Sequence, residues 1–144
     1  MSATATLPDL LEKQLQRQAI AYQLRPLHEA GPASQQISVC LLSDEDGVVL
    51  TLIPSDHLLD LRELEKLTQR PLQPVRDKQL QRILDHYQLS YLPGLPALVE
   101  APCIIEQGLL NQPRVWMPSG LAGWCLELDN QALKALVDSA TAAS

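Results

Sequence analysis

The side chains that could do chemistry in this chain are few and scattered. Its histidines, His28, His57 and His86, are far apart and lack the spacing of a metal site, such as two histidines one helical turn apart. No Gly-x-Ser-x-Gly segment is present to hold a serine nucleophile on a strained turn. No glycine-rich loop is followed by Lys and Ser or Thr, as a phosphate-binding loop requires. We therefore expect neither a metal nor a cofactor.

His57 is the histidine whose position most suggests a function. It ends the segment Pro54-Ser55-Asp56-His57, directly after an apolar run that we expect to be a central strand. Strand ends are where α/β proteins place their sites. Entry into the next helix explains the same polar residues, so both interpretations stay open. His86 falls on a predicted helix and is interpreted as a surface or boundary residue.

The charge of the chain is negative overall but uneven. A net charge of −6 disfavours broad, sequence-independent binding to a nucleic-acid backbone. Residues 61–82 nevertheless carry an excess of basic side chains, namely Arg62, Lys66, Arg70, Arg76, Lys78 and Arg82. This strip is either a pair of solvated helix faces or a docking surface for an acidic or phosphate-bearing partner, with Arg76, Lys78 and Arg82 as the candidate contacts.

The cysteines and the terminal segments indicate a cytoplasmic protein. Cys40, Cys103 and Cys125 are odd in number and fit neither a disulfide set nor a zinc site, so we expect buried thiols in a reducing compartment. No apolar run approaches the roughly 20 residues that cross a bilayer. The first six residues lack the basic and apolar regions of a secretion signal. No membrane partner is expected.

Hydrophobic periodicity predicts one α/β (α+β) domain over residues 1–144, with a mixed sheet surrounded by helices and frayed ends at about 1–5 and 139–144. Helix caps are predicted at Thr6, Asp60, Asp77 and Asp129. The runs 37–42 and 48–53 predict a β-hairpin with a five-residue linker, both strands being buried on both faces. Further strands are expected near 20–24, 72–75, 103–105, 114–117 and 124–128, with a Pro/Gly turn at 92–96.

The order of these segments resembles the YbaK, ProX and prolyl-tRNA-synthetase editing-domain family of aminoacyl-tRNA deacylases. The matching segments are 37–42, 48–60, 93–96, 102–110 and 115–128, within about residues 20–138. The resemblance implies a partly barrel-like sheet and a pocket for the aminoacyl group on the 3′ end of a tRNA. It implies ester hydrolysis without a metal, helped by a lysine on the first hairpin strand and by backbone groups of a Gly-x-x-Pro turn.

Carried over by position, the resemblance assigns the following candidate site residues. Ser38 stands at the lysine position, and Gly94 and Pro96 belong to the Pro/Gly turn. The glycine loop that borders the pocket corresponds to Ser119, Gly120 and Gly123, although turn geometry explains these three equally well. His57 matches the Pro-x-Asp-His segment, and His28 matches a histidine that often opens the pocket loop.

Three departures separate this chain from the family pattern. Serine replaces the lysine, and losing a preorganised stabiliser of negative charge typically costs about 10²–10³ in rate. Pro93 alters the turn, because proline fixes φ and has no N–H to donate. Only nine residues separate Leu27 from Ile37, where the family has a longer loop and helix.

Three functions are therefore open. The first is an active deacylase that uses Ser38 and backbone groups alone. The second, which we favour, is an editing-type domain with weak or lost hydrolysis that binds an aminoacyl group, a tRNA 3′ end or a protein partner. The third is a regulatory or protein-interaction module, such as the N-terminal part of a larger multidomain protein, that docks another domain through the basic strip.

Overall fold

The computed structural model describes residues 7–137 and 141–143. Its strands are β1 (Gln23–Pro26), β2 (Ile37–Asp44), β3 (Gly47–Pro54), β4 (Gln73–Pro74), β5 (Cys103–Glu106), β6 (Arg114–Pro118), β7 (Trp124–Asp129) and β8 (Thr141–Ala143). Its α-helices are α1 (Asp9–Arg17), α2 (Leu61–Thr68), α3 (Asp77–Tyr87), α4 (Pro96–Val99), α5 (Gln107–Leu110) and α6 (Asn130–Leu136). Two 3₁₀ turns, η1 (Leu27–Glu29) and η2 (Ala33–Gln35), lie between β1 and β2.

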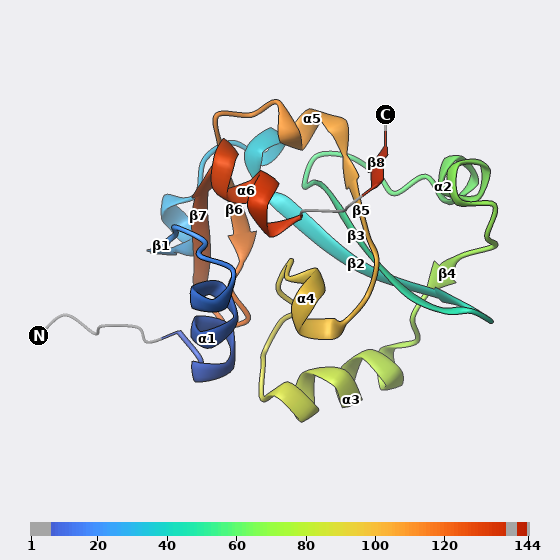
Figure 1. The fold of residues 1–144 in the computed structure, drawn as a ribbon, viewed down its shortest axis with the longest axis horizontal. Helices are drawn as coiled ribbons and strands as arrows, with labels where there is room; N and C mark the ends of the chain where they lie inside the picture. Colours follow the sequence, from blue (N-terminus) through green and yellow to red (C-terminus); the bar gives the residue numbers. More distant parts are fainter. Residues whose placement is uncertain (1–6, 138–140, 144) are drawn as a thin grey trace, which may run out of the picture.

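The strands form two sheets (Figure 1). The smaller sheet is antiparallel in the order β1-β7-β6, and the larger has the order β4-β2-β3-β5-β8. In the larger sheet β4-β2-β3 is antiparallel, whereas β3-β5-β8 is parallel. A bridge between Gln36 and Trp116 connects the two sheets. This mixed α+β architecture, with partly joined sheets and surrounding helices, confirms the predicted fold class.

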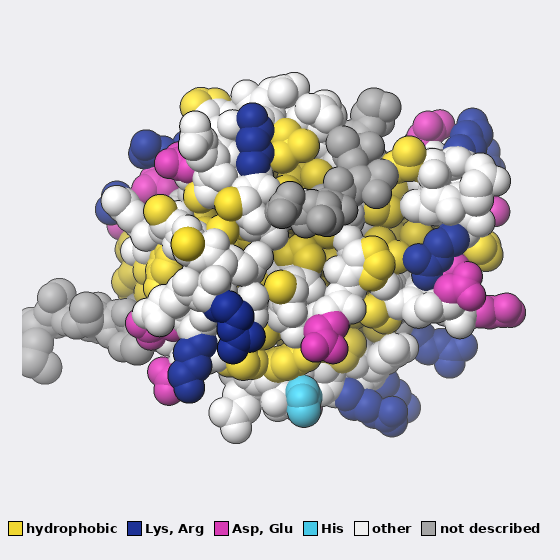
Figure 2. Space-filling model, in the orientation of Figure 1, with side chains coloured by type: hydrophobic (Ala, Val, Ile, Leu, Met, Phe, Trp, Pro, Cys, Tyr) yellow, Lys and Arg dark blue, Asp and Glu magenta, His cyan; other side chains and the backbone are white. Residues whose placement is uncertain are grey.

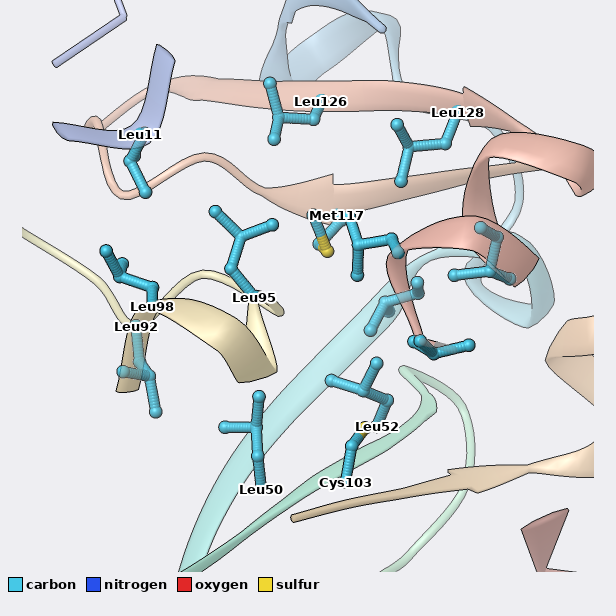
Figure 3. Packing of buried hydrophobic residues seen from close by; sticks show 14 of the residues in the cluster. Leu11, Leu50, Leu52, Leu92, Leu95, Leu98, Cys103, Met117, Leu126 and Leu128 are labelled. Carbon is cyan, nitrogen blue, oxygen red and sulfur yellow. The ribbon is translucent and has the colours of Figure 1, made fainter. Parts of the chain in front are cut away.

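The main core fills the space between the two sheets (Figure 3). Leu126 and Leu128 of β7 lie across it from Leu50 and Leu52 of β3, and all four side chains are almost fully buried. Helices α1 and α4 close the core, as Leu11 and Leu98 show. Because the chain has no Phe, this interior consists mainly of branched aliphatic side chains.

A second, smaller cluster lies on the other side of β3. Side chains alternate along a strand, so Val49 points away from the face that carries Leu50 and Leu52. Val49 packs with Leu64 of α2 and with Ile104 of β5 in a cluster of five buried residues. Helix α2 is therefore attached to the sheet by a much smaller apolar contact than the one that joins the two sheets.

Several predicted elements are confirmed with changed limits. The hairpin is tighter than predicted, because Asp44 pairs with Gly47 and leaves a two-residue turn in place of a five-residue linker. Gly47 has φ of 129°, a conformation that favours glycine. Burial on both faces is right for β3 but wrong for much of β2, which is half-buried from Ser38 to Cys40.

The predicted helix caps have different outcomes. Asp60 accepts hydrogen bonds from the amides of Arg62 and Glu63 at 3.1 Å, and Asp129 accepts one from Ala132 at 2.7 Å, so these two caps are confirmed. The cap at Asp77 is wrong, because Asp77 is the first residue of α3. Thr6 lies outside the described residues.

The C-terminal tail differs from the prediction over three residues. Thr141–Ala143, expected to be frayed, forms β8 and pairs in parallel with β5. The backbone groups on that side of β5 thereby gain hydrogen-bond partners. Residues 1–6, 138–140 and 144 lie outside the described part. No described helix combines the length and apolar character that a membrane-spanning segment needs.

Candidate functional site

A cavity of about 320 Å³ opens where the two sheets meet. Its walls come from the loop that follows β1, the first half of β2, the segment after α3, and the turn between β6 and β7. None of its lining residues is charged or a histidine; they are Leu27, Ala30, Gln36, Ile37, Ser38, Val39, Tyr91, Leu92, Trp116, Met117, Pro118, Ser119, Leu121, Gly123, Trp124 and Cys125. The cavity therefore suits an uncharged group and offers no cation to an anionic one.

Ser38 lies in the wall of this cavity. It is half-buried on β2, opposite Ile53 of β3 in the strand register. The neighbouring Gln36 also lines the cavity, and its side-chain amide donates to the carbonyl of Gly31 at 2.6 Å. At the position that the sequence resemblance aligns with a lysine, the cavity wall thus has the neutral hydroxyl of Ser38, and no lining residue carries a positive charge.

Trp116 forms an aromatic wall beneath the loop after β1. A Cβ atom added to Gly31 would lie 2.4 Å from Cζ3 of the Trp116 ring, so only glycine allows the loop to pack this closely on the indole. The indole Nε1–H is buried and has no hydrogen-bond partner among the described residues. A buried tryptophan N–H usually finds a partner, so this wall has an unused donor.

The turn between β6 and β7 is held by the Ser119 hydroxyl. This hydroxyl donates its one proton to the carbonyl of Trp124 at 2.9 Å, with the carbonyl of Leu121 a longer alternative acceptor at 3.2 Å, and accepts from the Leu121 amide at 3.1 Å. Gly123 lines the cavity with φ of 83°, and its carbonyl accepts a hydrogen bond from the Leu27 amide at 2.8 Å. Ser119 and Gly123 therefore shape the cavity, and the Ser119 hydroxyl proton is used in holding the turn.

Gly120 and Gly94 support the region without lining the cavity. Gly120, at φ of 83°, packs so that an added Cβ would lie 2.9 Å from Leu89, and its carbonyl accepts from the Ser90 amide. An added Cβ on the buried Gly94 would lie 2.5 Å from Sδ of Met117, which is a lining residue. Pro96 is the first residue of α4 and likewise does not line the cavity.

The two candidate histidines lie away from the cavity lining. His57 follows β3, and its Nδ1 lies 2.6 Å from Oε1 of Glu106 at the end of β5. His28 is in η1 and is exposed, whereas its neighbour Leu27 lines the cavity. The described residues contain no group of three His, Cys, Asp or Glu side chains placed to hold a metal ion.

The basic strip is interrupted in the structure. Arg70 makes two hydrogen bonds to Asp44, from Nε at 2.7 Å and from Nη2 at 2.5 Å, and so ties the end of α2 to the hairpin tip. Within residues 7–137, Arg76, Lys78 and Arg82 have no acidic partner within ion-pair distance. Lys and Arg side chains lie along the right-hand side of Figure 2, around α2, β4 and α3.

The cysteines are free thiols. Burial, followed by the charges of Glu127 and Glu29, raises the pKa of Cys125, which lines the cavity. Burial also raises the pKa of Cys103 to about 12. A thiol with a raised pKa is a poor nucleophile, because the thiolate is the reactive form. Cys125 therefore contributes apolar surface to the cavity.

Sequence reasoning missed several residues of this wall, above all Trp116, Trp124 and Tyr91. The two tryptophans lie on the paired strands β6 and β7 of the smaller sheet, and Tyr91, in the segment after α3, joins them only through tertiary packing. A local signal existed for the tryptophans, because they stand on either side of the small-residue loop 118–123. A large aromatic beside a glycine loop is a common composition for a pocket wall.

The fold and this cavity define a class of α+β proteins in which two joined sheets border a cavity. Residues 26–136 match the family model described as "Aminoacyl-tRNA editing domain". The chain belongs to this family. No curated protein matches the sequence significantly.

Two solved structures illustrate the likeness. The "putative signal transduction protein" of Marinobacter aquaeolei VT8 has a TM-score of 0.88 and 22% sequence identity over 96% of this chain. This chain spans only 30% of that protein. A structure described as "a putative trans-editing enzyme for prolyl tRNA synthetase" has a TM-score of 0.73 and 17% identity, over 99% of this chain and 98% of the other. At these identities the likeness concerns the fold.

Proposed function

We propose that this chain is an editing-type domain that binds an aminoacyl group, or the aminoacylated 3′ end of a tRNA, and hydrolyses the ester weakly or not at all. The observation that carries the proposal is the absence of any charged residue from the lining of the cavity. Ester hydrolysis develops negative charge on the carbonyl oxygen, and fixed donors or cations aimed at that oxygen provide much of the catalysis. Here the lysine position holds Ser38, whose hydroxyl supplies at most one neutral hydrogen bond.

Binding remains favourable in the same cavity. Its volume of about 320 Å³ falls within the range of small-molecule sites. Leu92, Met117 and Trp124 offer apolar surface to an amino-acid side chain. We expect an uncharged aminoacyl side chain to bind better than a charged one, because the cavity has no group to pair with a charge.

The test separates binding from turnover. Hydrolysis of Ala-tRNA(Pro) and Cys-tRNA(Pro) at micromolar protein should not exceed the uncatalysed background. A stable amide analogue of alanyl-adenosine should nevertheless bind, as measured by titration calorimetry. Efficient turnover by the unmodified chain would contradict the proposal that hydrolysis is weak or lost. Absence of any heat of binding would contradict the proposal that the cavity binds an aminoacyl group.

A matched pair of lysine variants sharpens this test. Ser38→Lys places a cation in the cavity wall and should raise hydrolysis by about 10²-fold or more if the pocket is otherwise intact. Ser43→Lys adds the same charge on the same strand, near the hairpin tip and outside the lining, and should leave hydrolysis at background. Equal rates for the two variants would mean that the altered Pro/Gly turn or the short loop also removed activity.

A second candidate function is a non-catalytic regulatory module of a larger protein. The likeness to 30% of the Marinobacter "putative signal transduction protein" favours it, since there a domain of this fold occurs within a longer chain. The basic residues Arg76, Lys78 and Arg82 are the candidate docking contacts. Reversal of these three charges should weaken capture of a partner domain or retardation of tRNA in a gel. No change in either assay would identify them as a solvated surface.

A further inference from the structure

A second hollow lies between α2 and the larger sheet and shares no lining residue with the cavity. It has a volume of about 370 Å³. Its floor is formed by Thr51 and Ile53 of β3 and by Ile104 of β5, and its outer wall by Leu58 and Leu67. We call this hollow the α2 groove. It exists because α2 contacts the sheet mainly through Leu64 in the small second cluster, which leaves the rest of the helix standing away from β3 and β5.

The α2 groove carries unusually exposed apolar side chains. Leu58 is 95% exposed and Leu67 is 45% exposed, and both line the groove. Two of the other large apolar side chains exposed in the described part, Leu27 and Tyr91, line the cavity. Apolar exposure therefore gathers at the hollows, and exposed apolar side chains that cluster beside a groove mark a candidate interaction surface.

The rim of the α2 groove is acidic. Asp60, Glu63 and Glu106 line it, against one basic residue, Lys66. The ammonium of Lys66 lies 3.6 Å from a carboxylate oxygen of Glu63. One oxygen of Glu106 lies 2.6 Å from Nδ1 of His57, and one oxygen of Asp60 caps α2. Each acidic residue thus has one oxygen engaged within the chain, and the lining keeps more acidic than basic groups. A partner that brings a basic side chain beside an apolar one would match this rim, whereas an acidic partner would be repelled.

The floor also contains an unsatisfied polar atom. The Thr51 side chain is 1% exposed, and its hydroxyl has no hydrogen-bond partner among the described residues. Such atoms are rare in folded proteins and deserve a physical explanation, which a water or a bound polar group approaching the floor would supply. The groove thus combines apolar walls, a negative rim and one spare polar group below.

We propose that the α2 groove is a docking site for a protein segment that presents a leucine-sized apolar side chain next to a lysine or arginine. The apolar side chain fills the space between Leu58, Leu67 and Ile104, and the basic group lies against Glu106 and Asp60. This interaction does not depend on the cavity or on hydrolysis. It gives the domain a way to be recruited by a partner while the cavity stays open to its own ligand.

The experiment is a selection of random peptides displayed on phage against the whole immobilised chain, followed by affinity measurement with the synthesised winners. We expect the selected peptides to carry a large aliphatic residue beside Lys or Arg. The double variant Leu58→Ser/Leu67→Gln should weaken their binding about tenfold or more, because each exposed leucine loses its buried contact. Leu10→Ser, which removes a leucine of 41% exposure on α1, is the matched control and should leave affinity unchanged.

Charge variants give effects of opposite sign. Glu63→Lys should weaken the binding of basic peptides, and Lys66→Glu should strengthen it. Both effects should shrink as the salt concentration is raised. Enrichment of acidic peptides, no enrichment at all, or peptides whose affinity the double leucine variant does not change would each overturn the proposal. Binding of the alanyl-adenosine analogue should be the same in the double variant and the parent chain. A wrong proposal for the α2 groove is therefore distinguishable from a wrong proposal for the cavity.

Discussion

The cavity and the α2 groove are similar in size but differ in how they are built. The cavity is assembled from segments far apart in the sequence, around residues 27–39, 91–92 and 116–125, and is lined only by neutral groups. The α2 groove comes mostly from the single stretch 51–67, with a contribution from β5, and its rim is charged. The first belongs to the joint between two sheets, whereas the second depends on one helix and a few leucines.

This difference has an energetic meaning. Ile37, Leu92 and Met117 of the cavity lining belong to the main core, which joins the two sheets. The α2 groove depends on a separate cluster of five buried residues. Regions with few buried apolar contacts open locally at lower free energy than the core. We therefore expect the groove to be the more easily lost of the two.

The largest difference between the two hollows is expected for the variant Leu64→Ala. Leu64 is buried in the second cluster, and removing such a side chain typically costs about 2–5 kcal/mol. Hydrogen exchange should show lost protection in α2 while β6 and β7 remain protected. Leu67→Ala, at a side chain that is half exposed, should have little effect. Equal loss of protection in both sheets would mean that the groove and the cavity unfold as one unit.

A smaller effect is expected from Gly94→Ala at the cavity. The new Cβ would lie 2.5 Å from Sδ of Met117 and 3.2 Å from Cδ2 of Leu52, and overpacking of this kind costs about 1–3 kcal/mol. Urea denaturation should show the lower stability of the variant, and displacement of Met117 should weaken binding of the alanyl-adenosine analogue. Gly108→Ala is the control, because its nearest neighbour would be 3.8 Å away. An unchanged midpoint for Gly94→Ala would contradict the close packing behind the cavity wall.

The smallest effect concerns the ion pair that ties α2 to the hairpin. The hydrogen bonds from Arg70 lower the pKa of Asp44 from 3.8 to about 2. A carboxyl whose pKa is lower in the folded state adds stability that is complete above its unfolded pKa and is lost as pH falls toward the folded value. Arg70→Gln should therefore be less stable than the parent at pH 6, and the difference in urea midpoint should shrink between about pH 4 and pH 2. A difference that stays constant over this range would show that Asp44 and Arg70 do not interact in solution.

The sequence predicted well what depends on neighbouring residues. Asp60 and Asp129 were identified as caps because a carboxylate before an apolar helix stripe has a local hydrogen-bonding role. The two apolar runs predicted the hairpin, but the predicted turn was too long. Strand pairing continues through the polar residues Ser43 and Asp44, where the apolar pattern has already ended. Asp77 has the composition of a cap but lies one residue too late.

The hollows themselves were less accessible to sequence reasoning. The position of Ser38 was singled out by resemblance, and the structure places it in the cavity wall. Trp116, another lining residue, lies on the other sheet and meets Ser38 only through the packing of the two sheets. The groove depends on the angle at which α2 leaves the sheet, and no local pattern around Leu58 or Thr51 encodes that angle.

The placement of the tryptophans has a practical consequence. The chain contains two, Trp116 and Trp124, and both line the cavity. Intrinsic indole fluorescence of the whole protein therefore reports on this one region, without any label or engineered probe. A ligand entering the cavity should shift the emission, while a peptide in the α2 groove, which has no tryptophan in its lining, should leave it unchanged. Tryptophan emission therefore distinguishes ligand binding in the cavity from peptide binding in the α2 groove.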